Sequence, residues 1–322
     1  MITIQQVTDY LLKHIADPVP KYLFVKEILK KPHSSHEYVS AYNDVSQSKW
    51  YRELADDQNE DGSWGSAFHG GNLAAAKGRK FACTEVALKR AHELGLSKDD
   101  PIIIKCIRLM ERYVRNEESW KDRIEKHRDN GKGHLFSRPF MTAAVISMFD
   151  PDNPVTEPLR DVAAKTLKTA FAEGVFDEDY WSQNEREYHV PGIVKPNVFY
   201  GLMLMQKANY MDDTLQKHLL DYTWSVSGGI YYVSSVPPSD KQNVDNKSFD
   251  EWLKTLELLS GFSLFPNFMK NDVLPHLLYE VERLINNDVV CGINCRYAES
   301  YRDKNKRNID MILRIARILV KC

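Results

Sequence analysis

Apolar residues recur along most of the 322-residue chain at the three- and four-residue spacing of an α-helix. The alternation typical of a β-strand appears only briefly, in residues 230–235. A long polar loop rich in glycine and aromatic residues, followed by an apolar helix, returns about every 55 residues, which indicates stacked helical hairpins. The six predicted hairpins are residues 4–15 with 21–31, 35–56 with 80–94, 100–117 with 138–149, 156–173 with 196–209, 212–225 with 248–262, and 271–287 with 306–321.

The two helices of a predicted hairpin differ in character. Most of the second helices are apolar around much of their circumference, as in residues 141–144 and 198–203, which predicts burial on most sides. First helices such as residues 157–173 carry more charge and should be amphipathic. The loops within hairpins run to about 20 residues, and the loops between hairpins are short, so the long loops should gather at one end.

Six hairpins are the right number to close into a ring of second helices inside first helices. We therefore expect an all-α fold, an (α/α)6 toroid that forms a single domain over residues 1–322. Residues 1–33 would be the N-terminal hairpin that completes the ring. An open solenoid also satisfies the repeat.

The sharpest motif is QNEDGSWG at residues 58–65, in the loop of the second hairpin. Gly62 and its neighbour Gly65 allow turn geometry that a Cβ would resist. Trp64 can pack across neighbouring helices, and the Gln58 amide can bind loop backbone or helix ends. With Asp61, these residues are interpreted as a structural staple between repeats.

Preceded by residues 50–54 (WYREL), this motif resembles the QW repeat of squalene/hopene cyclases and their relatives, which include the β-subunits of protein prenyltransferases. Residues 228–231 and 292–297 hold weaker copies. The resemblance covers the chain from about residue 35 to its end and agrees with the hairpin count. It implies an (α/α)6 toroid whose central cavity binds or converts an isoprenoid, which can be a diphosphate.

Acid–base chemistry has its best sequence candidates in Asp177, Glu178 and Asp179. The repulsion between adjacent carboxylates could raise one pKa and create a general acid, although the Asp-x-Asp-Asp motif of class II terpene cyclases is absent. The alternative is an exposed acidic turn after Gly174. His189, just ahead of a second helix, is the best single proton carrier by placement.

Cations stand at or just before the start of each of the last five second helices, where helix N-termini add partial positive charge. In a toroid these positions would ring the mouth of the cavity and could bind a diphosphate or a carboxylate above an aromatic lining. The alternative is that the charges of these polar loops face water. The candidates for this anion site are Lys80, Arg138, Lys195, Tyr200, Tyr231, Trp252 and Arg307.

Composition narrows the setting. A formal net charge of −2 gives no drive toward nucleic acid or an anionic membrane, and no apolar run is long enough to span a bilayer. Five scattered cysteines favour a reducing cytosol, so we expect a cytoplasmic protein. No resident metal or cofactor is expected, because Cys291 and Cys295 lack a nearby histidine in the C-terminal stretch. Magnesium would enter only with a diphosphate ligand.

Three functional hypotheses follow. The first is an isoprenoid cyclase or prenyltransferase-like enzyme. The second is a lyase or hydrolase of acidic polysaccharides on a helical toroid, with acid and base drawn from residues 177–187. The third is a non-catalytic toroid that acts as a binding protein or scaffold. A carboxylate that points into a cavity would favour an enzyme over a binding protein.

Overall fold

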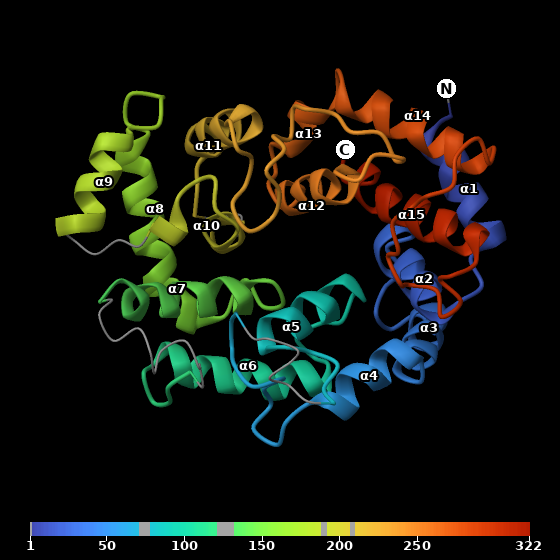
Figure 1. The fold of residues 1–322 in the computed structure, drawn as a ribbon, viewed down its shortest axis with the longest axis horizontal. Coiled ribbons are helices and arrows are strands. Elements are labelled where there is room, and N and C mark those ends of the chain that lie inside the picture. Colours follow the sequence, from blue (N-terminus) through green and yellow to red (C-terminus); the bar gives the residue numbers. More distant parts are fainter. Residues whose placement is uncertain (1, 71–77, 121–131, 188–191, 207–209) are drawn as a thin grey trace. The chain divides into compact units, whose positions relative to one another are not determined.

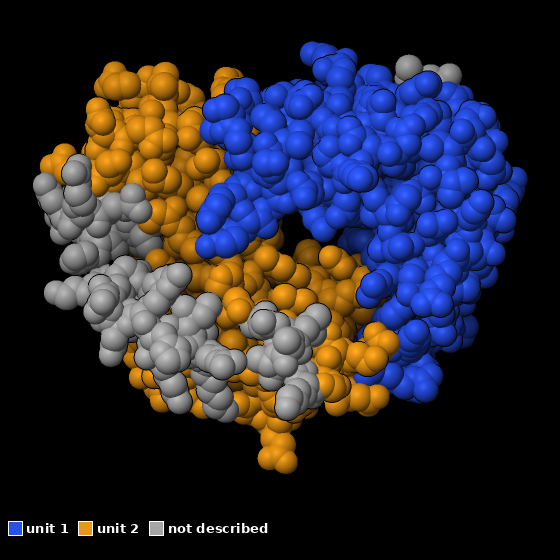
Figure 2. Space-filling model, in the orientation of Figure 1, with its two compact units in different colours: residues 1–52, 224–322 blue, residues 53–223 orange. Residues whose placement is uncertain are grey.

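The computed structural model describes residues 2–70, 78–120, 132–187, 192–206 and 210–322, apart from the side chains of 132–136 and 184–187. Within these residues every element longer than an isolated β-bridge is a helix (Figure 1), which confirms the all-α prediction. By their contacts the residues form two compact units (Figure 2): unit 1 is Met1–Arg52 with Trp224–Cys322, and unit 2 is Glu53–Thr223. None of the described helices has the length and apolar composition needed to cross a bilayer.

The core of unit 2 lies around two helices that pack against each other, α7 and α10. The helix α10 packs against α7 and α8, and α6 packs against α7. Every residue of α10 is buried, as its apolar composition predicts for a second helix of a hairpin. The α-helices of unit 2 are α5 (Thr84–Glu93), α6 (Pro101–Val114), α7 (Lys132–Ser147), α8 (Glu157–Ala170), α9 (Glu178–Glu187), α10 (Phe199–Met205) and α11 (Asp213–Ser225), which ends in unit 1.

Unit 1 is built around its C-terminal helix, α15, which is largely buried from Asn308 onward. The helices α1, α12 and α14 and the π-helix η1 pack against it. The helices of unit 1 are α1 (Ile4–His14), α2 (Pro18–Leu23), η1 (Phe24–Ile28), α3 (His36–Ser46), α4 (Lys49–Asp57, which ends in unit 2), α12 (Phe249–Leu259), α13 (Phe265–Met269), α14 (Val273–Ile285) and α15 (Lys304–Leu319).

Two buried arginines anchor other elements of unit 1 to α15. Arg317 donates from Nε and Nη2 to the two carboxylate oxygens of Glu27 in η1, at 2.7 and 2.8 Å. Arg314 binds Glu257 of α12 in the same two-pronged way, at 2.6 and 2.8 Å. Burial alone would lower the pKa of Arg317, but the Glu27 carboxylate outweighs it and raises that pKa. Each arginine therefore stays charged and fixes a neighbouring element.

Replacing Arg317 by methionine should destabilise unit 1, because Glu27 would keep its charge in a site where only 23% of its side chain is exposed. Breaking such a pair costs about 3 kcal/mol. The matched control is Arg302→Met, which removes an exposed arginine and should change stability by less than about 0.5 kcal/mol. Denaturant unfolding of both variants measures the difference, and equal midpoints would contradict the anchoring role.

Most helices lie within a few residues of the predicted limits, but α7 begins at Lys132, six residues before the predicted start at residue 138. The predicted helix 35–56 is two helices, α3 and α4, because the chain breaks at Ser48, whose Oγ accepts the N–H of Tyr51 at 3.3 Å. The short helices α9 and α13 lie where the pattern predicts loop. Polar residues fill most of α9, so it has few apolar residues to mark it as a helix, and its Trp181 is fully buried.

The motif at residues 58–65 ties three segments of unit 2 together. Trp64 is fully buried and donates from Nε1 to the carbonyl of Leu54 in α4 at 2.8 Å. The Gln58 amide donates to the carbonyl of Gly62 at 3.0 Å and to that of Ile102 in α6 at 2.8 Å. The loop is thereby bound to the end of one helix and the start of another.

Gly65 is the glycine of this loop where an added Cβ would come closest to the backbone. Its φ of +63° lies in the left-handed region, and an added Cβ would come within 2.2 Å of the Ala82 carbonyl oxygen. Backbone cannot move aside as easily as a side chain, so Gly65→Ala carries both conformational strain and a steric clash.

We expect Gly65→Ala to lower stability by about 2–3 kcal/mol. Gly78→Ala is the control, because Gly78 has a similar φ of +74° and no atom within 4 Å of the added Cβ. It should lose only about 1 kcal/mol. Thermal unfolding of both variants tests the difference, and equal losses would show that the approach to Ala82 is of no consequence.

Candidate functional site

A group of titratable side chains in unit 2 surrounds Glu85, in the first turn of α5. Its carboxylate lies 2.5 Å (Oε2) from His69 Nδ1, and its Oε1 accepts from the Tyr200 hydroxyl at 2.7 Å. The same Oε1 lies 2.8 Å from Lys89 Nζ. These four residues, His69, Glu85, Lys89 and Tyr200, are called the Glu85 cluster below.

The local fold explains why these side chains meet. The loop before α5 runs along the start of the helix, because the backbone N–H groups of Thr84 and Glu85 donate to the carbonyls of Ala67 and Phe68, each at 3.0 Å. His69 follows directly and so reaches Glu85. Lys89 lies one turn further along α5, at the spacing at which helical side chains pair. Tyr200 comes from the buried helix α10.

Glu85 is ionised in this setting. Its side chain is only 5% exposed, and burial by itself would raise its pKa. The hydrogen bond from His69 and the charge of Lys89 outweigh burial and lower the pKa of Glu85 to about 2. A carboxyl group with this pKa is not a general acid near neutral pH, but it can accept a hydrogen bond from a neighbouring imidazole.

His69 is the member of the cluster suited to move a proton. With a proton on Nδ1 directed at Glu85, the other ring nitrogen, Nε2, is the basic one. The Tyr200 hydroxyl lies 3.2 Å from Nδ1, so a second proton-bearing group adjoins the ring. His69 and Lys89 are 29% and 34% exposed, which opens the otherwise buried cluster to solvent. The arrangement combines a buried anion, an oriented imidazole, a phenol and an ammonium group.

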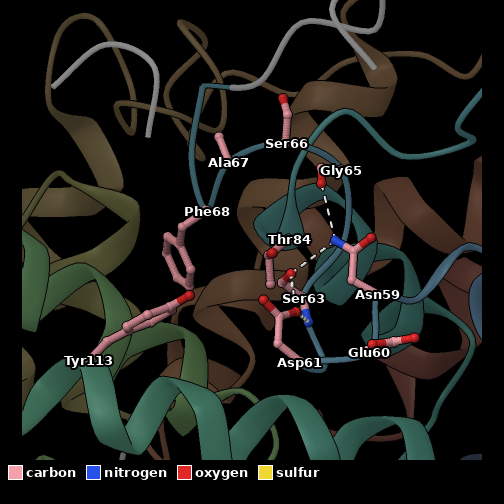
Figure 3. A pocket seen from close by; sticks show the side chains of 10 residues that line it. All are labelled: Asn59, Glu60, Asp61, Ser63, Gly65, Ser66, Ala67, Phe68, Thr84 and Tyr113. Carbon is pink, nitrogen blue, oxygen red and sulfur yellow. Dashed lines mark hydrogen bonds between the residues drawn. The ribbon is translucent and has the colours of Figure 1, made fainter. Parts of the chain in front are cut away.

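A pocket of about 430 Å³ adjoins the same stretch of backbone (Figure 3). It is lined by loop residues between Asn59 and Phe68, by Thr84 at the start of α5, and by Tyr113 of α6. His69 and Glu85 do not line this pocket, although each directly follows a residue that does. The pocket and the Glu85 cluster therefore share one loop and one helix start.

Hydrogen bonds within the motif shape the polar wall of this pocket. Oδ1 of Asp61 accepts from the backbone N–H and the hydroxyl of Ser63, at 2.9 and 2.5 Å. The Asn59 amide donates to Ser63 Oγ at 3.0 Å and to the carbonyl of Gly65 at 3.1 Å (Figure 3). These bonds hold the loop in a fixed conformation around Gly62, whose φ is +97°.

The predicted acidic residues lie at the start of α9, in unit 2. Asp177 Oδ1 accepts the N–H of Tyr180 at 2.8 Å, which is the contact of a helix cap. Glu178 and Asp179 occupy the first turn of α9, where carboxylates complement the helix dipole. None of the three joins the Glu85 cluster. His189 lies outside the described residues.

The predicted cations of unit 2 contact residues outside the Glu85 cluster. Lys195 Nζ binds Glu178 at 3.1 Å, and the Arg138 guanidinium lies 5.8 Å from the ring centre of Trp120. Lys80 is exposed, and its backbone N–H donates to Asp57. Of the predicted anion-site residues in unit 2, only Tyr200 belongs to the Glu85 cluster.

The other three predicted residues lie in unit 1. Trp252 is fully buried, and its Nε1 donates to the carbonyl of Pro238 at 2.9 Å. Tyr231 is 63% exposed beside Tyr232 in a turn, and Arg307 is half-buried near the start of α15. Within the part of the chain that the structure describes, no group of three or more His, Cys, Asp or Glu residues is arranged to hold a metal ion.

Comparisons of the chain with protein-family models, with curated proteins and with solved structures gave no significant match.

Glu85 makes the stability of the protein depend on pH in acid. Because its folded-state pKa is lowered to about 2, its contribution is complete above the unfolded-state value near 4.5 and is lost as the pH falls toward 2. We expect Glu85→Gln to lower stability at pH 7 by about 2–3 kcal/mol, since the hydrogen bonds to a charged group are lost.

Thermal unfolding from pH 7 to pH 2.5 measures this dependence. The gap in melting temperature between the original protein and Glu85→Gln should narrow as the pH falls below 4.5. A constant gap over this range would show that Glu85 is not held ionised by its partners.

Proposed function

We propose that this protein is an enzyme that uses the Glu85 cluster for acid–base chemistry on a small anionic substrate. The observation that carries the proposal is that one buried, ionised carboxylate is bound at once by an imidazole, a phenol and an ammonium group. Burying an ionised carboxylate is costly unless it is paired, and here two of the pairing groups are partly exposed. Strongly perturbed ionisable groups in such a setting are typical of catalytic sites.

Each member of the cluster has a role in this proposal. His69 accepts or donates a proton at Nε2, while Glu85 fixes the ring and stabilises the imidazolium form. The Tyr200 hydroxyl is the second proton-bearing group. Lys89 binds the anionic group of the substrate through Nζ, which lies 4.3 Å from the ring centre of Phe199.

The first substrate class is an isoprenoid, as a diphosphate where the head group is anionic. The QW-like motif supports it, because the geometry of residues 58–65 is that of a tie between helices. An (α/α)6 toroid is part of the same proposal, supported by the alternation of buried helices such as α10 and α15 with amphipathic ones such as α6 and α14. Magnesium would enter with the diphosphate.

An acidic sugar is the second substrate class, and one observation favours it. Removal of a proton next to a carboxylate needs a base, an acid and a cation close together. His69, Tyr200 and Lys89 all contact Glu85, so the cluster brings these three groups into one place. A lyase or hydrolase of acidic saccharides would use the same residues in the same roles.

The two substrate classes are separated by binding and turnover assays with the full chain. Farnesyl and geranylgeranyl diphosphate, with and without magnesium, form one set of ligands, and glucuronic acid and its oligosaccharides form the other. Lys89→Met should weaken binding of the true class about tenfold, because it removes an ammonium group that contacts the anion. The control is Lys217→Met, another lysine with a carboxylate one turn along its helix but with 63% of its side chain exposed.

His69→Asn and Tyr200→Phe should reduce turnover by at least about 100-fold while the substrate still binds. Binding without turnover in the original protein would favour the non-catalytic alternative. If neither ligand set binds, or if Lys89→Met and Lys217→Met behave alike, the proposal is overturned.

A further inference from the structure

We propose that the pocket beneath the motif of residues 58–65 is a second binding site, and that it takes a neutral sugar. This site is separate from the Glu85 cluster, because no cluster residue lines it. Its volume of about 430 Å³ is within the range of pockets that bind small molecules. Polar groups and aromatic rings line it together (Figure 3). The inference does not depend on the proposed enzymatic function.

The side chain that points to a ligand is Tyr113 of α6. Only 7% of this residue is exposed, yet its hydroxyl has no hydrogen-bond partner among the residues that the structure describes. Figure 3 shows the ring reaching from α6 toward the middle of the lining residues, with the hydroxyl at its inner end. Burial raises the pKa of this hydroxyl, and the charges of Asp61 and Glu118 raise it further, so it keeps its proton. Because buried phenols normally have a partner, we infer that a ligand oxygen in the pocket provides it.

The wall of the pocket offers hydrogen-bond donors and acceptors together. The Ser66 hydroxyl, like that of Tyr113, has no partner within the described part of the chain, so two O–H donors face the site. The carboxylate of Glu60, at the exposed edge, can only accept. A sugar hydroxyl has one donor hydrogen and two acceptor lone pairs, so it can pair with either kind of group. A ligand that only donates or only accepts would leave some of these groups unpaired.

The other polar groups of the wall are held by the loop itself. Oδ1 of Asp61 accepts the backbone N–H and the hydroxyl of Ser63. The Thr84 hydroxyl accepts the N–H of Trp64 at 3.0 Å and donates to the carbonyl of the same residue at 3.2 Å. The polar wall is thus fixed before a ligand arrives, which reduces the entropy lost on binding.

Charges of both signs surround the pocket, which favours a neutral ligand. The carboxylates of Glu60 and Asp61 are among its lining groups. Cations are bonded to the adjoining residues of the loop and of α6, namely Lys105, Arg79 and Arg112. An anion would meet the carboxylates, and a cation would be repelled by the cations around them. Neither sign of ligand charge is therefore selected.

Aromatic rings form the apolar side of the pocket. The ring of Phe68 meets that of Tyr113 edge to face, with 6.2 Å between centroids, and both residues line the cavity (Figure 3). Phe68 also stacks on Trp120 at 4.2 Å, which keeps its ring in place. A sugar ring has hydroxyl groups around its edge and C–H groups on its faces, so it can use a polar wall and an aromatic wall at once. The pocket provides both.

Isothermal titration calorimetry on the full chain tests the site with glucose, galactose and maltose as probes. The comparison ligands are cyclohexanol, which has a six-membered ring with a single hydroxyl, and 1,4-diaminobutane, which is a cation. We expect saturable binding of at least one sugar, with an affinity at least about tenfold higher than that of either comparison ligand, because several hydrogen bonds are lost with the hydroxyls.

Tyr113→Phe removes only the hydroxyl and should weaken sugar binding about three- to tenfold. It should not lower the melting temperature, because the hydroxyl has no partner to lose within the described structure. Ser66→Ala should weaken binding about two- to fivefold. The matched control is Tyr279→Phe, since Tyr279 is 52% exposed on α14 and lies outside the pocket, so the affinity should be unchanged.

Equal sugar affinities of Tyr113→Phe and Tyr279→Phe would overturn the proposal. The absence of binding by all three sugars would also overturn it, as would tighter binding of either comparison ligand than of every sugar. Lys89→Met, in the Glu85 cluster, should leave the sugar affinity unchanged, and an equal loss in this variant would place the sugar at the cluster instead. Failure of the isoprenoid and glucuronic acid assays would leave the outcome unaffected, since Tyr113 and Ser66 lie outside the cluster.

Discussion

The ionised carboxylate of Glu85 is the constraint around which this part of unit 2 is arranged. A charge with 5% exposure needs several partners, and one segment of the chain cannot provide them all. Its partners come from the loop before α5, from α5 itself and from α10. Because all three segments must be correctly placed for the carboxylate to be satisfied, the cost of an unpaired charge selects one arrangement of loop and helices.

In unit 1 buried charges are also paired, but there the pairs fix helices in place. Arg314 and Arg317 each donate two parallel hydrogen bonds to one carboxylate, that of Glu257 and that of Glu27 respectively. This two-pronged geometry is the one that best matches a guanidinium. Only 6% and 14% of these arginine side chains are exposed, so they fix helices and offer little to a ligand. In the Glu85 cluster the side chains of His69 and Lys89 are about one-third exposed. The Glu85 cluster and the two arginine pairs therefore differ in solvent access, although both contain buried charge.

Sequence periodicity could predict most of the helices, because a helix with one buried face has apolar residues at regular three- and four-residue spacings. It also predicted the complete burial of α10, whose apolar residues leave no polar face. It could not locate the Glu85 cluster. Tyr200 lies 115 positions after Glu85, and nothing in the local sequence marks the pair. The available signals were a glutamate in the first turn of a helix, a lysine four residues later and a histidine in a glycine-rich loop, and each has ordinary structural uses.

The structure gives the three acidic residues at 177–179 different surroundings. They lie at the start of α9, where Asp177 caps the helix and Glu178 binds Lys195. A helix separates neighbours in sequence by 100° and gives each a different environment.

The loop of residues 66–69 contributes to both the pocket and the Glu85 cluster of unit 2. Phe68 lines the pocket, and the next residue, His69, binds Glu85. In the same way Thr84 lines the pocket, and the next residue, Glu85, belongs to the cluster. Backbone hydrogen bonds from Thr84 and Glu85 to Ala67 and Phe68 hold the loop against α5. The same backbone hydrogen bonds therefore hold both Phe68, in the pocket wall, and His69, in the Glu85 cluster, against the start of α5.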